Sequence, residues 1–280
     1  MSQEPDTVDV WLVPTDLPAP VLEELSAHLD ADELHRAANL PDPTRRARFV
    51  AAHGALRSII AGRLGMSPAT LRWSHGLHGK PELADLAGAP RVSLSHCAGL
   101  ALVALSRRRC VGVDIERMPA DRDAIRLAAR YFPPAQAAFV AAADSADSVN
   151  AADEADEADE GVADSAAGRF TTLWSRKEAC VKVRGGRLVE GFPLAVHGSA
   201  PLAVRDGEGP GDAVYLVHDL PAPQRHRAAV ALAGPEPSRV RWHAWAPASG
   251  QSADPAIGQA LSLATGAAQT TKTPKRDSYA

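Results

Sequence analysis

The stretch Gly112-Val113-Asp114-Ile115-Glu116 holds two carboxylates two positions apart inside an apolar run. Residues two apart in a β-strand point to the same face, so a strand here presents Asp114 and Glu116 together. Val113 and Ile115 then point to the opposite face, where a core can cover them. An edge strand that shows polar residues to water is the alternative, but the apolar neighbours and the space left by Gly112 favour a buried acidic pair.

The stretch from Trp174 to Lys182, WSRKEACVK, has the spacing of a helix. Trp174, Glu178 and Lys182 recur every four residues and therefore form one stripe. Mg²⁺ takes oxygen ligands and usually leaves several positions to water and phosphate oxygens. Carboxylates from the strand and the helix, Asp114, Glu116 and Glu178, therefore suit a magnesium ion bound to a pyrophosphate.

Glu178 and Lys182 are the candidate catalytic residues. Glu178 is predicted to bind the metal, to accept a proton from an attacking hydroxyl, or both. Lys182 is predicted to neutralise a developing phosphate charge or to protonate a leaving group. The alternative is an ordinary helix-surface pair, worth roughly 0.2–0.5 kcal/mol. Trp174 is expected to pack in the core rather than against a ligand.

The charge of the chain is unevenly distributed. Its formal net charge of −4 over 280 residues includes nine acidic and no basic residues between Asp144 and Asp164, so the remainder is net positive. A mildly basic body suits an anionic small substrate or an acidic partner protein, but it lacks the dense basic stripe expected for nucleic acid. The chain shows no apolar run long enough for a membrane span, no signal-like N-terminus and no paired cysteine spacing. We expect a cytoplasmic protein.

Only five of the basic residues are lysines, and three of these lie in the predicted body, namely Lys80, Lys177 and Lys182. Lysine offers a compact charge that arginine does not replace, so their positions favour function over chance. Ser95 and His96 follow a predicted strand and could hold a phosphate, although a strand-end histidine is more often a surface residue. Lys80, in a Gly-Lys-Pro loop, could present an ammonium group to a ligand.

The hydrophobic pattern predicts strands alternating with helices. Asp42, Pro43 and Gly65 are start and stop signals for one helix. Expected strands are 8–13, 92–94, 100–105, 110–115, 215–218, 227–233 and 239–245, and expected helices are 43–64, 121–130, a short one after Pro134, and 170–183. A faint echo between the two halves, each with helices followed by two strands, hints at a duplicated α+β unit.

In this order, five motifs together resemble the 4′-phosphopantetheinyl transferases of the Sfp type. They are Arg48-Phe49, Gly79-Lys80-Pro81, Leu94-Ser95-His96, Gly112-Val113-Asp114-Ile115-Glu116 and Trp174-x-x-Lys177-Glu178-Ala179-x-x-Lys182. The last two are specific as a pair, and the first three support them. The resemblance spans residues 8–245 and leaves out the acidic segment and the tail.

The resemblance implies an α+β pseudo-dimer of two similar halves, 1–112 and 113–247, with the active site in the cleft between them. Composition, and not the resemblance, indicates an acidic disordered loop at about 144–168 and a disordered tail at 248–280. We also expect a monomer. Such enzymes transfer the 4′-phosphopantetheine arm of coenzyme A to a serine of an acidic acyl or peptidyl carrier protein and release 3′,5′-ADP. These carriers serve fatty-acid, polyketide or nonribosomal peptide assembly.

Residue roles carried over from the family are expectations as well. Asp114, Glu116 and Glu178 would bind Mg²⁺, and Lys182 would contact the leaving phosphate of coenzyme A. The remaining coenzyme A contacts would be Ser95 and His96 to the phosphates, Lys80 to the nucleotide end and Arg48 to the 3′-phosphate.

Two positions depart from the family pattern as we expect it: Gln136 stands in place of a carboxylate and His53 in place of an arginine. Two other functions stay open at this point. One is a magnesium-dependent transferase or hydrolase acting on another nucleotide pyrophosphate, and the other is a non-catalytic protein that binds coenzyme A or a carrier protein.

Overall fold

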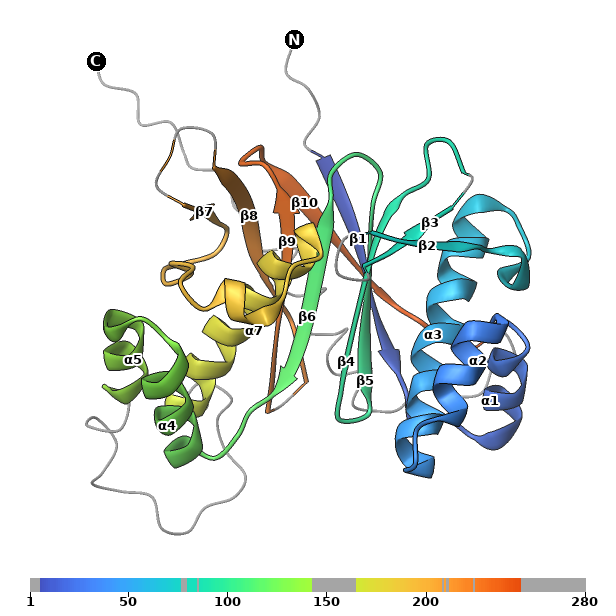
Figure 1. The fold of residues 1–280 in the computed structure, drawn as a ribbon, viewed down its shortest axis with the longest axis horizontal. Coiled ribbons are helices and arrows are strands. Elements are labelled where there is room, and N and C mark those ends of the chain that lie inside the picture. The colour runs from blue at the N-terminus through green and yellow to red at the C-terminus, as the bar shows by residue number, and fades with distance from the viewer. Residues whose placement is uncertain are drawn as a thin grey trace, which may run out of the picture.

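The computed structural model describes residues 6–76, 80–84, 86–142, 165–207, 209, 212–223 and 225–247. Within these ranges the chain has the predicted α+β fold (Figure 1). The expected tail and nearly all of the expected acidic loop lie outside the described residues. Among the described helices none is long and apolar enough to cross a membrane.

Two four-stranded sheets form the centre of the molecule. In the first, the order is β10-β1-β5-β4, with β1 and β10 parallel and the other neighbours antiparallel. These strands are β1 (Asp6–Pro14), β4 (Arg91–Cys97), β5 (Leu100–Ser106) and β10 (Ser238–Ala244). The second sheet has the antiparallel order β6-β9-β8-β7. It consists of β6 (Val111–Arg117), β7 (Leu202–Asp206), β8 (Ala213–Leu220) and β9 (His226–Ala233).

Helices cover the outer faces of both sheets, so the layers run helix, sheet, sheet, helix (Figure 1). The first sheet is covered by α1 (Ala19–Ser26) and α3 (Pro43–Leu64), and α2 (Ala31–Ala38) packs against α3. The second is covered by α4 (Asp121–Tyr131), α5 (Pro134–Ala141) and α7 (Ala166–Arg184). A small sheet of β2 (Trp73–His75) and β3 (Pro81–Leu83) and two short 3₁₀ helices, Pro68–Thr70 and Leu188–Gly191, complete the described elements.

The two sheets pack face to face through alternate residues of their strands. Val8 and Val10 of β1 meet Val113 and Ile115 of β6 in one buried cluster, and all four side chains are fully buried. This placement is the one predicted from the period of two in β6. It leaves the other face of β6, with its carboxylates, to meet α7.

The chain crosses between the sheets twice, before β6 and again before β10. The expected division into halves at residue 112 falls inside β6. In addition, β10 was expected to belong to the C-terminal half, but it pairs with β1 in the first sheet. The pseudo-dimeric arrangement stays a prediction. It is supported by the matching orders β1-β5-β4 and β6-β9-β8, each accompanied by three helices.

The long helices end as the sequence predicts. In α3, the Asp42 side chain accepts a hydrogen bond from Thr44 N (3.0 Å), and the helix ends at Gly65 in the left-handed region. In α7, Gly185 has the same conformation at φ 71°, which glycine adopts without steric cost. Ser165 caps the other end of α7. This helix therefore begins before the expected Phe170, and the loop expected to reach residue 168 ends sooner.

Several short elements were not predicted, among them α1, α2, β2, β3 and β7. They are too short to show a hydrophobic period, and α2 is held by a capping box between Asp30 and Glu33. Asp121, predicted as a helix cap, is instead the first residue of α4. Its carboxylate accepts a hydrogen bond from Ala167 N (2.7 Å) and so connects α4 to the start of α7.

A buried cation lies at the same place in both long helices, about two turns before the terminal glycine. In α3 it is Arg57, which is fully buried, donates to Glu33 Oε2 at 2.6 Å and also pairs with Asp30. In α7 it is Lys177, which is 1% exposed and donates to the carbonyls of Phe192 (2.7 Å) and Leu194 (2.5 Å).

The two cations differ in their acidic partners. Glu33 is the third residue of α2, and Gln136 is the third residue of α5. The helices on the second sheet therefore have a neutral amide at the position where the helices on the first sheet have a carboxylate. Gln136 Nε2 donates to the carbonyl of Leu194 (2.9 Å), which Lys177 also contacts. Burial without a paired carboxylate lowers the pKa of Lys177 to about 7.

We expect Arg57→Met to destabilise the protein by about 3–5 kcal/mol, because it leaves the Glu33 carboxylate buried without its main cation. Chemical denaturation measures the change. Arg126→Met is the control, since Arg126 pairs with Asp123 (3.2 Å) at the surface, where an ion pair contributes about 0–1 kcal/mol. Equal effects of the two substitutions would contradict a structural role for the buried network.

Candidate active site

The three predicted metal ligands come together between β6 and α7. One carboxylate oxygen from each of Asp114, Glu116 and Glu178 lies within 4.8 Å of the other two. Asp114 and Glu116 point from the same face of β6, and Glu178 reaches them from the middle of α7. The predicted convergence of the three carboxylates is therefore observed, and their role as metal ligands stays a prediction.

Gly112 allows α7 to lie directly against β6. A Cβ atom at this position would be 2.0 Å from the carbonyl oxygen of Ala179 and 2.7 Å from the backbone nitrogen of Val183. The sequence led us to expect open space beside the carboxylates, and this expectation is wrong, because the backbone of α7 fills that space. Any side chain at residue 112 would push the helix and Glu178 away from the strand.

Lys182 lies one turn beyond Glu178 and is bound to the acidic cluster. Its Nζ donates to Asp114 Oδ1 (2.5 Å) and Ser95 Oγ (2.9 Å) and is 3.5 Å from Glu178 Oε2. Burial alone would lower the pKa of Lys182, but the charges of Asp114 and Glu178 outweigh burial and raise it. The ammonium group therefore stays charged beside the carboxylates.

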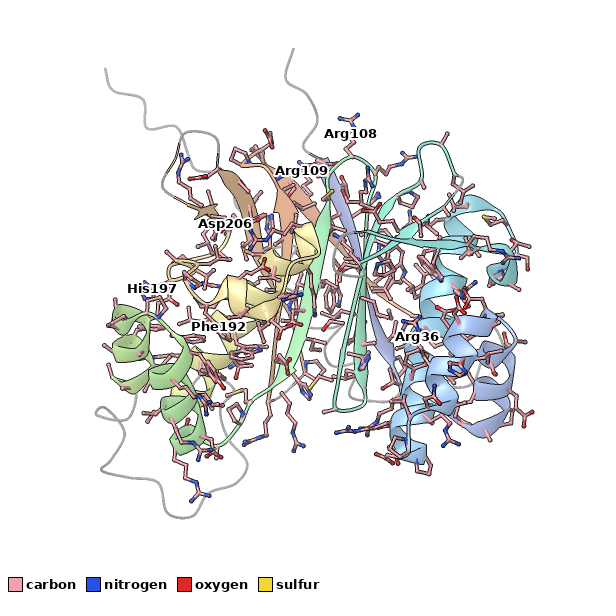
Figure 2. All side chains as sticks on the ribbon, viewed as in Figure 1. Arg36, Arg108, Arg109, Phe192, His197 and Asp206 are labelled. Atoms are coloured by element: carbon pink, nitrogen blue, oxygen red, sulfur yellow. The ribbon has the colours of Figure 1, made fainter. Side chains whose placement is uncertain are left out.

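Ser95 and Trp174 hold two of the carboxylates in place. Ser95 Oγ donates to Asp114 Oδ1 (2.8 Å) from β4, an edge strand of the first sheet. Trp174 Nε1 donates to Glu178 Oε1 (3.0 Å), while its ring packs near Phe170 and near Phe192, which is labelled in Figure 2. Trp174 packs in the core as expected, but the sequence did not reveal that its indole N–H also orients Glu178.

The cluster carries more negative charge than its own residues neutralise. Burial, Asp114 and Glu178 together raise the pKa of Glu116 to about 7. Burial and then Asp114 also raise the pKa of Glu178. Asp114 Oδ2 is buried and accepts no hydrogen bond from the described residues. A divalent cation would relieve this repulsion and satisfy that oxygen, so the residues present fit a hard metal ion.

His96 and Arg48, two further residues expected to contact coenzyme A, lie outside the group of three carboxylates. His96 follows Ser95, and its pKa is lowered by desolvation and by the nearby His53 and Lys182. Arg48 forms a two-pronged ion pair with Asp16 (2.6 and 2.9 Å) beside the turn between β4 and β5. The expected phosphate contacts of His96 and Arg48 stay predictions.

Lys80 points to the backbone instead of toward an open site. Its Nζ donates to the carbonyls of Val111 (3.0 Å) and Val183 (2.7 Å). The structure thus gives two of its three N–H groups to protein, and the expected contact with the nucleotide stays a prediction.

A groove of about 470 Å³ lies between α2 and β2 and was not predicted from the sequence. Arg36, Arg72 and Trp73 are among its lining residues. Arg36 and Trp73 also line a smaller neighbouring hollow with His53. Arg36 lies where α2 meets α3 (Figure 2), and its guanidinium is 5.6 Å from the centre of the Phe49 ring. Arg36 belongs to α2, a helix that was not predicted, so no motif pointed to it.

The family comparison covers the part of the chain that carries the acidic cluster. A model of the 4′-phosphopantetheinyl transferase superfamily matches residues 110–231, which include β6 and α7. Over this segment the chain is similar to the 4′-phosphopantetheinyl transferase superfamily. The matched segment contains Asp114, Glu116, Glu178 and Lys182 of the family motifs.

The chain is also similar to two individual proteins. The chain is 39% identical over 131 residues to the 4′-phosphopantetheinyl transferase HetI of Nostoc sp., covering 46% of this chain and 55% of that protein. It is 28% identical over 177 residues to the putative 4′-phosphopantetheinyl transferase slr0495 of Synechocystis sp., covering 63% of this chain and 64% of that protein. The chain thus spans between half and two thirds of the length of these relatives.

We expect Gly112→Ala to destabilise the protein by about 1–3 kcal/mol or more, since the new methyl group meets backbone atoms that cannot move independently. Mn²⁺ affinity should fall as well, because α7 carries Glu178. Thermal unfolding and metal titration measure the two effects. Gly62→Ala is the matched control: Gly62 lies in α3 with nothing within 4 Å of the added atom, so stability there should stay level or rise. Normal metal binding by Gly112→Ala would contradict the close packing.

We expect Glu116→Gln to raise the Tm of the metal-free protein by roughly 2–4 °C at about pH 8. A gain of about 1 kcal/mol in the free energy of unfolding produces this shift in a domain of 150–250 residues. The Glu116 pKa is about 7 in the folded protein against an ordinary 4.5. The folded state therefore binds more protons between these values, and stability falls as pH rises through them. The gain should shrink toward pH 5. Thermal unfolding in the presence of a chelator measures the difference in Tm. With saturating Mg²⁺, wild type should instead have the higher Tm of the two proteins.

Proposed function

We propose that this protein transfers the 4′-phosphopantetheine arm of coenzyme A to a serine of an apo carrier protein and releases 3′,5′-ADP. The observation that carries the proposal is the meeting of three carboxylates and one ammonium group at a single point, contributed by the two most specific family motifs. The similarity of residues 110–231 to the 4′-phosphopantetheinyl transferase superfamily supports the same reaction class.

The reaction exchanges one phosphorus–oxygen bond for another. The serine oxygen forms a bond to the phosphorus that carries pantetheine, and the bond from this phosphorus to the bridging oxygen breaks. The electron pair leaves with 3′,5′-ADP, and the serine proton goes to a base. When bound at Asp114, Glu116 and Glu178, Mg²⁺ would supply positive charge against the pyrophosphate oxygens.

Glu178 is our choice for the base that receives the serine proton, directly or through water. Burial and the neighbouring Asp114 raise the pKa of Glu178, which moves it toward the range where a carboxylate is an effective base near neutral pH. The hydrogen bond from Trp174 fixes the orientation of the Glu178 carboxylate. Lys182 is already charged beside Asp114 and would stabilise the leaving phosphate.

The nucleotide of coenzyme A would extend from Lys182 past Ser95 and His96 toward α2 and α3. His53, Arg36 and Trp73 line the hollow in that direction. Guanidinium groups bind phosphate with well-defined geometry, and an aromatic ring offers a stacking surface. Arg48, the expected 3′-phosphate contact, would have to exchange its Asp16 partner for the phosphate.

An acidic carrier protein has a basic helix available beside the site. Arg122, Arg126 and Arg130 recur every four residues along α4 and are exposed. This helix follows directly on β6, whose end carries Glu116. Charge complementarity of this kind promotes association and orients the partner. It supports the expected acidic acyl or peptidyl carrier protein as partner rather than a nucleic acid.

We keep the expectations of a monomer and of a cytoplasmic location as proposals. All three cysteines, Cys97, Cys110 and Cys180, are free thiols in the structure. Free thiols are ordinary in a reducing compartment.

The assignment is tested by incubating the protein with coenzyme A, Mg²⁺ and an apo carrier protein and measuring the intact mass of the carrier. We expect a phosphopantetheine increment that disappears when a chelator is added. A panel of carriers from fatty-acid, polyketide and peptide systems should be included. If no carrier gains mass and the protein hydrolyses other nucleotide pyrophosphates, the result would favour a magnesium-dependent enzyme acting on those compounds. If the protein only binds coenzyme A, the result would favour a non-catalytic binding protein.

Glu178→Gln should lower turnover by at least roughly 10²-fold while coenzyme A binding changes little, because the amide cannot accept the serine proton. Glu190→Gln is the control, since Glu190 pairs with Arg184 (3.1 Å) outside the cluster. Steady-state kinetics and coenzyme A titration give the two quantities. Unchanged turnover in Glu178→Gln would remove this residue from the mechanism.

A further inference from the structure

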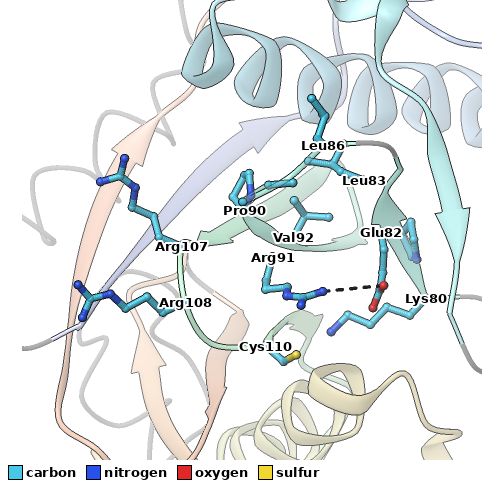
Figure 3. Close-up of a pocket in the computed structure, with 13 residues that line it drawn as sticks. Lys80, Glu82, Leu83, Leu86, Pro90, Arg91, Val92, Arg107, Arg108 and Cys110 are labelled. Atoms are coloured by element: carbon cyan, nitrogen blue, oxygen red, sulfur yellow. Dashed lines mark ion pairs between the residues drawn. The ribbon is translucent and has the colours of Figure 1, made fainter.

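The ammonium group of Lys80 bridges the backbones of β6 and α7, the two elements that carry all three carboxylates. Lys80 precedes β3, and its Nζ donates to the carbonyl of Val111 in β6 (3.0 Å) and to the carbonyl of Val183 in α7 (2.7 Å). Lys80 also lines a pocket of about 250 Å³ with Arg91 and Cys110. Figure 3 shows its side chain lying along this pocket with the amino group directed toward the end of α7.

Both carbonyls need a donor from outside their own element. Val183 belongs to the last turn of α7, where backbone carbonyls have no partner within the helix. Val111 begins β6, which is an edge strand of the second sheet. A positive charge at the C-terminal end of a helix also interacts favourably with the helix dipole. Lys80 therefore satisfies two backbone acceptors that the fold leaves open at one point.

This point is the crossing of α7 over β6. Val111 adjoins Gly112, and Val183 adjoins Lys182, so the residues that Lys80 contacts are the neighbours of site residues. The hypothetical Cβ of Gly112 lies 2.7 Å from Val183 N, which shows how closely the two backbones approach there. Gly112 permits the approach by having no side chain, and Lys80 holds the two elements together by hydrogen bonds.

We propose that Lys80 is a positioning residue that fixes α7 against β6 and thereby sets the separation of Asp114, Glu116 and Glu178. Burial lowers the pKa of Lys80, in agreement with an ammonium group enclosed by protein. The acidic residue beside it, Glu82, pairs with Arg91 (3.9 Å). This role differs from the nucleotide contact that the family resemblance implies.

Lysine suits this position better than arginine. The two carbonyls converge on one point, and a compact ammonium group offers three donors around a single atom. A planar guanidinium spreads its donors over a larger fork and needs more room. The requirement offers a reason for one of the few lysines in a chain whose basic residues are mostly arginine.

The test compares Lys80→Met, which keeps the length of the side chain and removes its donors, with wild type and with Arg91→Met. Arg91 lines the same pocket, and its ion-pair partner is Glu82 of β3. Hydrogen exchange of residues 178–184, titration with Mn²⁺ and steady-state kinetics are measured on the full chain. In Lys80→Met we expect faster exchange, and Mn²⁺ affinity lower by about 10–100-fold, as for residues that support metal ligands.

The kinetic measurement rests on the proposed function, whereas the exchange and Mn²⁺ measurements do not. Turnover should fall in Lys80→Met while the KM for coenzyme A stays within about twofold, and Lys80→Arg should restore part of the Mn²⁺ affinity. If the wild-type protein transfers no phosphopantetheine to any carrier, the proposed function is overturned. Hydrogen exchange and Mn²⁺ titration would then decide the role of Lys80.

Three results would overturn the positioning role. The first is weaker coenzyme A binding with unchanged exchange and unchanged Mn²⁺ affinity, which would make Lys80 a nucleotide contact. The second is an equal loss in Arg91→Met, which would indicate a general charge effect. The third is wild-type behaviour of Lys80→Met in every measurement. Should Lys80→Met not fold, Lys80→Gln, which keeps an N–H donor on a shorter side chain, serves in the same comparison.

Discussion

The contact between the backbone of α7 and the glycine in β6 determines the geometry of the site. Three carboxylates can meet only if the helix lies closer to the strand than any side chain would allow, and Gly112 provides that approach. The two sheets then fix the strand from behind, because Val113 and Ile115 are fully buried in the layer between them. Packing on one face of β6 thus positions the chemistry on the other.

The electrostatic balance of the site differs from that of the rest of the molecule. Asp9 and Glu33 are buried carboxylates with arginine partners, and the pKa of each is lowered, because their hydrogen-bonded partners outweigh the effect of burial. Glu116 and Glu178 face each other and Asp114 with one lysine among them, and their pKa values are raised. Such stored repulsion is typical of functional sites, where stability is lower than the fold could otherwise reach.

The residues that could be predicted are those whose role follows from spacing along one element. The faces of β6, the stripe on α7 and the ends of α3 are set by periods of 2 and 3.6 and by caps, which sequence records directly. The partners of Lys80, the Trp174–Glu178 hydrogen bond and the ion pair of Arg48 with Asp16 depend on tertiary contacts. Elements such as α2 and β2 are too short to show a period, so the groove between them could not be foreseen.

The position of β10 also affects how the protein can be assembled during synthesis. This strand pairs in parallel with β1, and Arg241 and His243 bind Asp9 from 232 and 234 residues further along the chain. A growing chain therefore exposes one edge of β1 until almost all of the described protein has been made. Contacts this distant in sequence form slowly, and an open strand edge invites pairing with other chains. The first sheet thus leaves the ribosome unfinished, and β10 completes it only after every other described element has been made.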